Sequence, residues 1–140
     1  MSSIPVGARG SFSLIVTPEH LASRFKDATL PPVLATPVMI MVMENAALNA
    51  IKPYLEVGET AVGTRVDVRH LAATPAGRQV TGEAEVTKID GRRIVFMVRA
   101  IEGDKEIVLR REEFTLRGHG WIAFGQSRAT ATDVVEFFCE

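Results

Sequence analysis

The chain is poor in cysteine, in aromatic residues and in net charge. Of its 140 residues only Cys139 is a cysteine, so no disulfide can form within the chain. Aromatic residues make up 6% of the sequence, which leaves no evident platform for stacking nucleic-acid bases. The formal net charge of −1 gives no reason to expect nucleic acid or an anionic membrane as the main partner. Residues 1–11 lack an apolar signal segment, and we therefore expect a cytoplasmic protein.

The chain also lacks the motifs that mark several classes of enzyme. It contains no P-loop, no dinucleotide-binding glycine pattern and no Cys and His cluster at metal-ligand spacing. We accordingly expect no metal. Internal repeats and low-complexity segments are absent as well. A hydrophobic content of 46% and a charged content of 24% are typical of a globular protein, and this length predicts one domain over residues 1–140.

What is present is an apolar helix near the middle of the chain. Thr36 can cap it with its hydroxyl group, and Pro37 at the first helical position loses no N–H that the helix needs. Pro53 ends the helix because proline cannot continue one. Residues 38–43 are apolar on every face, which predicts a buried helix. The run is much shorter than the about 20 residues that cross a bilayer, so we expect no membrane span.

Glu44 follows this apolar run directly. Because burying an unpaired charge is costly, its carboxyl must be protonated, paired or directed into a wet cleft. One interpretation is an exposed helix edge beside Asn45 and Asn49, and the other is a functional carboxylate with a shifted pKa. Glu44 lies 44 − 36 = 8 residues after Thr36, about 12 Å along the helix axis, so one ligand can reach both. Capping alone is also a sufficient explanation of Thr36.

The remaining pattern predicts an α+β protein whose antiparallel sheet covers this helix. A short helix over 18–25 and a loop over 26–35 lead into the central helix. The strands are expected over 11–17, 61–73, 78–89, 92–101, 106–117 and 121–124, with a terminal helix or strand over 133–138. Turns are expected at 74–77, at Asp90-Gly91 and at 102–105.

The strand after the helix directs a histidine inward. Its outward residues are Arg65, Asp67 and Arg69, and its inward residues are Val66, Val68 and His70. A lone inward histidine is most often a hydrogen-bonded core residue, but a second unusual residue, Glu44, favours a shared site. A hydroxyl at a helix N-terminus, a carboxylate and a histidine suit acyl transfer. The helix N–H groups can polarise a carbonyl, and the side chains can move protons or attack it.

Four groups of segments carry motifs whose order and spacing can be compared with those of known families. They are Ala35-Thr36-Pro37 with Met43-Glu44-Asn45-Ala46, Pro53-Tyr54-Leu55-Glu56-Val57-Gly58-Glu59, Val62-Gly63-Thr64 with His70-Leu71-Ala72-Ala73-Thr74-Pro75-Ala76-Gly77, and Gly91-Arg92-Arg93. Together they resemble the fluoroacetyl-CoA thioesterase-like family over most of residues 5–117. The resemblance implies the hotdog fold, in which a curved antiparallel sheet wraps a long central helix. It also implies a homodimer that pairs sheets edge to edge and builds its sites at the interface.

The resemblance places the family's catalytic residues on Thr36, Glu44 and His70, and the glycine near the acyl group on Gly63. The family's lid is rich in phenylalanine, whereas this chain has Leu30, Val33 and Leu34 there. We expect Leu30 and Leu34 to contact the substrate, and specificity for fluoroacetate is open. Family members often carry a histidine or arginine late in the last long strand, and no equivalent stands out in 110–114. The tail beyond Gly118 is not explained by the resemblance.

These observations predict an acyl-CoA thioesterase that hydrolyses a small or medium acyl-CoA to coenzyme A and a free acid. Coenzyme A is part of the substrate, and no other cofactor is expected. Glu44 would act as nucleophile or as base for water, Thr36 would position the substrate or Glu44, and His70 would assist proton transfer. The alternative is a non-catalytic acyl-CoA-binding hotdog module. A hotdog hydratase is disfavoured because its neighbouring Asp and His on one overhanging segment are not found.

Overall fold

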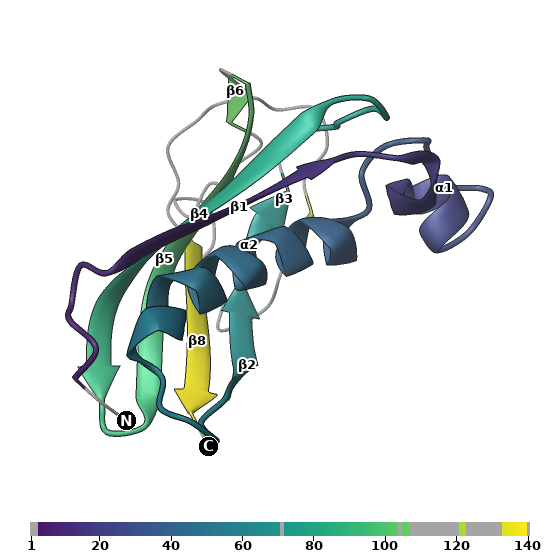
Figure 1. Ribbon diagram of the computed structural model, residues 1–140. Coiled ribbons are helices and arrows are strands. Elements are labelled where there is room, and N and C mark those ends of the chain that lie inside the picture. The colour runs from purple at the N-terminus through teal and green to yellow at the C-terminus, as the bar shows by residue number, and fades with distance from the viewer. Residues whose placement is uncertain (1–2, 71, 104, 107–120, 123–132, 140) are drawn as a thin grey trace.

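The fold consists of one long helix lying across the concave face of an antiparallel sheet (Figure 1). The computed structural model describes residues 3–70, 72–103, 105–106, 121–122 and 133–139. The helices are η1 (Pro18–His20), α1 (Ala22–Phe25), α2 (Thr36–Ile51) and η2 (Lys52–Tyr54). The strands are β1 (Arg9–Ile15), β2 (Ala61–Asp67), β3 (Arg69–His70), β4 (Gln79–Asp90), β5 (Arg93–Glu102), β6 (Lys105–Glu106), β7 (Trp121–Ile122) and β8 (Asp133–Cys139).

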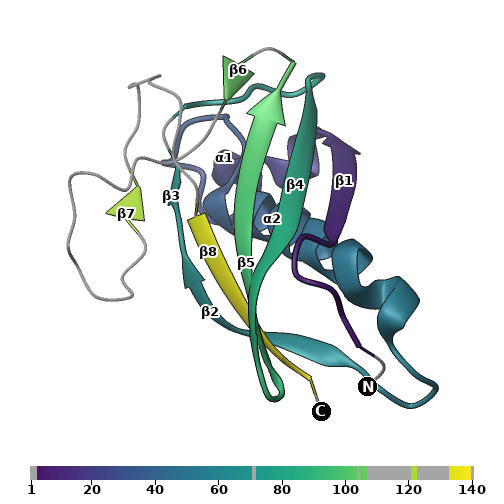
Figure 2. The ribbon, with the colours of Figure 1, turned by 90° about the vertical axis from the view of Figure 1, so that its left-hand side faces the viewer.

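The main sheet has the strand order β1-β4-β5-β8-β2, and β6 pairs with β5. All of these pairs are antiparallel, and they form a curved layer with α2 behind it (Figure 2). The β4–β5 hairpin turns through Gly91-Arg92, one residue beyond the predicted Asp90-Gly91 turn, and Gly91 adopts a φ of +60° that favours glycine. A separate parallel pair joins β3 to β7.

Side chains alternate across the sheet in the way that a half-buried strand requires. On β4 the residues Val80, Gly82, Ala84 and Val86 are buried against α2, and their neighbours point to the other face. The inward residues of β5 are Ile94, Phe96, Val98 and Ala100. Helix α2 contributes Val38, Met39, Val42, Met43, Ala46, Ala47, Ala50 and Ile51 to this core.

Two glycines allow the backbone of α2 to approach the sheet closely. A Cβ atom at Gly82 would lie 2.7 Å from the Val42 carbonyl oxygen. A Cβ atom at Gly10 of β1 would meet the Ala46 carbonyl and lie 2.8 Å from Ala50 Cα. These neighbours are backbone atoms of a regular helix, which cannot move aside as a flexible side chain can. The helix therefore packs on the sheet by backbone contact at these two positions.

Two predictions for the central helix are wrong in detail. The N-cap is Ala35, and Thr36 is the first helical residue with no capping hydrogen bond from its side chain. The Thr36 hydroxyl instead contacts His70, a more distant partner that the local capping rule does not consider. The helix is also not buried on every face, because Met41 is 41% exposed. The apolar residues that remain exposed form a stripe opposite the sheet.

The C-terminal segment enters the sheet. The terminal element over 133–138, predicted as a helix or a strand, is the strand β8, which fills the position between β5 and β2. The predicted strand over 61–73 divides into β2 and β3. Of the strand predicted over 106–117, only Glu106 lies within the described residues. Of the strand predicted over 121–124, the described part is β7.

None of the helices in the described part of the chain is long and apolar enough to cross a membrane.

The contact at Gly10 predicts the effect of adding one methyl group. Gly10→Ala places a Cβ against the α2 backbone, and we expect a loss of about 2 kcal/mol in the free energy of unfolding because overpacking displaces the helix. Chemical denaturation measures this loss. The control is Ser11→Ala, because Ser11 is the exposed neighbour on the same strand. Equal stabilities of the two variants would contradict the backbone contact.

Candidate active site

The site begins with a hydrogen bond between two predicted residues. Thr36 Oγ1 and His70 Nδ1 are 3.1 Å apart, although the residues are 34 positions apart in the sequence. Thr36 is the first residue of α2, and His70 belongs to β3. The structure therefore brings together a hydroxyl at a helix N-terminus and an inward histidine, as the alternation after the helix predicted.

The segment before α2 is held in place by backbone hydrogen bonds. The Leu34 N–H donates to the Thr74 carbonyl at 2.7 Å, and the Ala35 N–H donates to the His20 carbonyl at 2.9 Å. The first bond ties the start of the helix to the chain that follows His70. The second ties it to η1. These bonds position the Thr36 hydroxyl relative to the imidazole ring.

The imidazole of His70 is completely buried, with 0% of the residue exposed. Burial lowers its pKa to about 4, because the charged form loses its hydration, while a backbone hydrogen bond at Ala72 acts in the opposite direction. His70 is therefore neutral at pH 7. A neutral imidazole has one nitrogen that donates and one that accepts, so the bond with Thr36 helps to fix its tautomer.

Glu44 lies on the same helix but outside this hydrogen bond. Eight residues of α-helix place it about 12 Å along the axis and about 80° around it from Thr36. Its side chain is half-buried, and burial raises the pKa of the Glu44 carboxyl. Within the described residues the carboxyl makes no hydrogen bond or ion pair. It lies between Met41 and Leu48 on the exposed stripe of α2.

The residues predicted to bind substrate lie on three different segments. Gly63 is an exposed residue of β2, and the register with β8 shifts between Gly63 and Arg65. Such a bulge redirects backbone groups out of the regular ladder. Leu30 is 36% exposed on the connector before α2, whereas Leu34 is 1% exposed and packs in the core. The substrate contacts of all three remain predictions.

Sequence reasoning missed Thr74 as a candidate site residue. Thr74 is 0% exposed, and its hydroxyl oxygen has no hydrogen-bond partner within the described residues. The available signal was the alternation that placed His70 inward. It continues through the buried Ala72 to Thr74, although the local sequence pattern predicts only a turn at Thr74.

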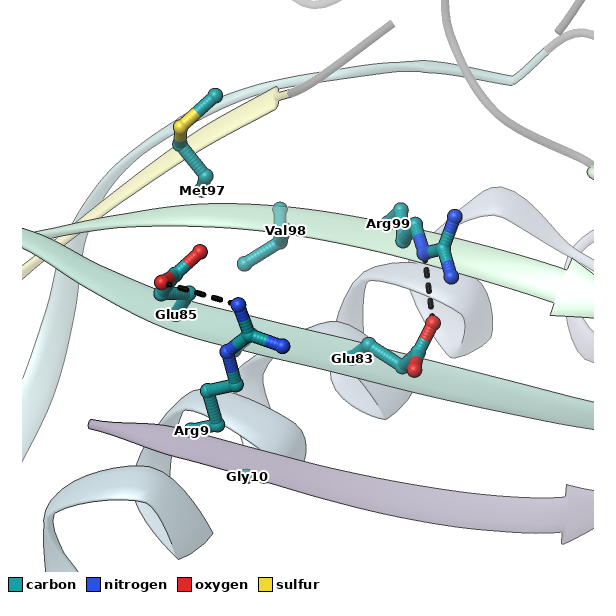
Figure 3. Close-up of a pocket in the computed structure, with 8 residues that line it drawn as sticks. Arg9, Gly10, Glu83, Glu85, Met97, Val98 and Arg99 are labelled. Carbon is teal, nitrogen blue, oxygen red and sulfur yellow. Dashed lines mark hydrogen bonds and ion pairs between the residues drawn. The ribbon is translucent and has the colours of Figure 1, made fainter. Parts of the chain in front are cut away.

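A shallow groove of about 270 Å³ lies on the opposite face of the sheet (Figure 3). It contains two cross-strand ion pairs, Arg9–Glu85 at 3.4 Å and Arg99–Glu83 at 2.6 Å. Exposed pairs of this kind contribute little to stability, and they are typical of a solvated sheet face. The groove is separate from Thr36 and His70, which lie on the helix side of the sheet.

Among the residues that the structure describes, no group of three or more His, Cys, Asp or Glu side chains is arranged to hold a metal ion.

Comparison with known proteins gives consistent matches. The model of the family described as fluoroacetyl-CoA-specific thioesterase matches residues 16–111. The fluoroacetyl-CoA thioesterase of Streptantibioticus cattleyicolor is 41% identical over 107 residues, which cover 73% of this chain and 77% of that protein. A crystal structure of a mutant of the fluoroacetyl-CoA-specific thioesterase FlK is 30% identical with a TM-score of 0.77, covering 100% of this chain and 90% of that chain.

A thioesterase superfamily member from Thermus thermophilus is also similar. It is 27% identical with a TM-score of 0.73, and the match covers 100% of this chain and 86% of that chain. The long helix and curved antiparallel sheet shared with these thioesterase structures confirm the predicted hotdog fold.

The buried neutral state of His70 predicts a loss of stability in acid. The unfolded chain binds a proton at this residue below a pKa near 6.5, whereas the folded chain does so only near 4. Stability is therefore lost as the pH falls between these values, by about 2 kcal/mol from pH about 7.5 to about 5. Urea denaturation gives the free energy of unfolding of wild type and His70→Gln at both pH values. The change in this free energy between the two pH values should be larger in wild type by the contribution of His70. Equal changes in the two proteins would rule out the buried neutral imidazole.

Proposed function

The chain belongs to the fluoroacetyl-CoA-specific thioesterase family and hydrolyses acyl-CoA thioesters, and we propose that Thr36, Glu44 and His70 carry out this reaction. The observation that carries the proposal is the 3.1 Å hydrogen bond between Thr36 and His70. It joins two polar side chains at the N-terminus of α2, where backbone N–H groups favour the negative charge that develops on a carbonyl oxygen.

The first turn of α2 supports a role for one particular backbone donor. Pro37 has no N–H, and the next two N–H groups donate to the Ala35 carbonyl at 3.0 and 3.1 Å. Within the described residues, the Thr36 N–H is the first-turn donor that remains for a substrate oxygen. We propose that the thioester carbonyl lies against this N–H and against the backbone at Gly63.

Glu44 lies about 12 Å along α2 from Thr36 of its own chain, too far to reach a carbonyl bound there. In the proposed reaction the acting residue is therefore Glu44 of the partner subunit in the homodimer proposed below. It acts in one of two ways. Its carboxylate attacks the carbonyl carbon and forms an anhydride that water then hydrolyses, or it removes a proton from an attacking water molecule. Both routes form a C–O bond, break the C–S bond and release coenzyme A, whose sulfur takes up a proton. Burial raises the pKa of Glu44, which strengthens its carboxylate as a base. Neutral His70 holds the Thr36 hydroxyl in position and assists the proton transfer.

We propose a small or medium acyl group as the substrate. The name of the relative from Streptantibioticus cattleyicolor indicates that it acts on fluoroacetyl-CoA, which carries a two-carbon acyl group. Leu30 and Leu34 are proposed to contact the acyl group in this chain. We propose that the protein uses no cofactor beyond the coenzyme A of its substrate. We also propose that it has no nucleic-acid or membrane partner and is located in the cytoplasm.

The exposed stripe of α2 supports a homodimer. Met41 is 41% exposed, and Ile40 and Leu48 beside it are half-buried. Among the described strands β2 lies at the end of the sheet, and its Val62 is 48% exposed. We propose that a second copy of the chain pairs with this sheet edge and covers the stripe. Glu44 then lies at the interface, where a second chain adds a wall to the site.

Replacement of Glu44 tests the catalytic assignment. Glu44→Gln retains the shape of the side chain but removes its negative charge, and we expect thioester hydrolysis to fall at least about 100-fold. Stability at pH 7 should be unchanged or higher, because a partly desolvated charge is removed. The measurement is release of free thiol from a panel of acyl-CoAs, from short to aromatic. Glu85→Gln on the outer sheet face is the control, and full activity in Glu44→Gln would refute the assignment.

A charge in the apolar stripe tests the dimer. Met41→Glu should weaken self-association at least about tenfold, because dimerisation would then bury an unpaired carboxylate. Sedimentation equilibrium gives the dissociation constants of wild type and variant. The matched control is Ile15→Glu, which places the same charge at an exposed apolar position on β1. A monomeric wild type, or equal association of wild type and Met41→Glu, would contradict the proposal.

A further inference from the structure

Thr74 is a polar side chain that the proposed mechanism leaves unused. It is 0% exposed, and its hydroxyl oxygen has no hydrogen-bond partner within the described part of the chain. A buried hydroxyl without a partner destabilises a folded protein, whereas valine would fill the same space without a polar atom. Buried polar groups nearly always have a hydrogen-bond partner. A hydrogen-bonding group of a bound ligand would supply that partner for Thr74.

The position of Thr74 connects it to the proposed active site. Burial follows an inward row from Val68 through His70 and Ala72 to Thr74. The Thr74 carbonyl accepts a hydrogen bond from the Leu34 N–H, two residues before Thr36 begins α2. Thr36 is half-buried, whereas His70 and Thr74 are inaccessible. Of the three side chains, Thr36 is therefore the one that solvent reaches.

The described residues tied to Thr74 through the backbone are apolar. Leu34, whose N–H bonds the Thr74 carbonyl, its neighbour Ala35, and Ala72 two residues before Thr74 are all buried and offer no side-chain hydrogen-bonding atom. A hydrocarbon chain that entered this region would leave the hydroxyl unsatisfied. A substituent with a hydrogen-bonding atom would satisfy it, and a site built in this way discriminates against an analogue that lacks the atom.

We propose that Thr74 is a specificity-determining residue whose hydroxyl hydrogen-bonds a polar substituent on the acyl group bound beside Thr36 and His70. The enzyme then favours a short acyl group that carries a hydroxyl or comparable hydrogen-bonding atom over its hydrocarbon analogue. This inference rests on the proposed function, because it needs the thioester to bind at the Thr36–His70 pair. It adds a substrate class that the three catalytic residues do not determine.

The test is a cycle of two protein variants and two substrates. Glycolyl-CoA carries a hydroxyl group where propionyl-CoA carries a methyl group. The wild-type protein and the variant Thr74→Val differ at residue 74 in the same way. We expect Thr74→Val to lower kcat/KM for glycolyl-CoA about tenfold and to leave or raise that for propionyl-CoA. Thr74→Ser, which retains the hydroxyl, should keep the preference for glycolyl-CoA. The melting temperature of Thr74→Val should be equal to or above that of wild type.

Two sets of outcomes separate this inference from the proposed function. If Thr36→Ala and His70→Ala lose hydrolysis while Thr74→Val has the wild-type ratio of the two kcat/KM values, Thr74 has no role in specificity and the inference is overturned. If Thr74→Val lowers both values equally, its role is structural and the inference is again overturned. If Thr36→Ala and His70→Ala retain full activity, the proposed site itself is wrong. Thr74→Ala provides a second hydroxyl-free variant should Thr74→Val fold poorly.

Discussion

The close approach of α2 to strands β1 and β4 is the constraint on which the geometry of the site depends. At Gly10 and Gly82 the sheet meets backbone atoms of the helix, and the glycines carry no side chain that could absorb a displacement. The helix axis is therefore fixed relative to the sheet over its middle and C-terminal turns. Because an α-helix is stiff over this length, its N-terminus is fixed as well. The 3.1 Å contact between Thr36 and His70, which belong to separate elements, follows from this fixed placement.

Burial favours the uncharged form of both titratable residues of the proposed site. It lowers the pKa of His70 and raises the pKa of Glu44, so that the uncharged form of each is favoured. For His70 the result near pH 7 is a neutral ring that can accept or donate a hydrogen bond. For Glu44 the result is a carboxylate that is less stable and more basic than one in water. A thioester hydrolase benefits from both, because the reaction needs a proton acceptor that is not already protonated.

The parts of the site that depend on local pattern were predictable, and the parts that depend on tertiary contacts were not. Alternation along one strand placed His70 inward, and the apolar run identified the central helix. Thr36 was expected to cap the helix because capping is a local rule, but its hydroxyl instead meets a residue 34 positions away. The role of Gly82 follows from the path of the helix over the sheet, which no local pattern specifies. Gly63 was identified only through resemblance, since an isolated glycine carries no chemistry of its own.

The apolar run over residues 38–43 explains the exposed stripe of α2 and supports the proposed dimer. A helix that is apolar on all sides needs two buried surfaces, and the sheet of its own chain covers only one. Met41 remains exposed on the other side, next to Glu44. In the proposed dimer a second copy supplies the missing surface, and the same contact removes more water from the Glu44 carboxyl. Desolvation already raises the pKa of Glu44 in one chain, and further loss of water at the interface acts in the same direction. In the proposed dimer, the basicity of Glu44, the residue that interrupts the apolar run, thereby depends on assembly.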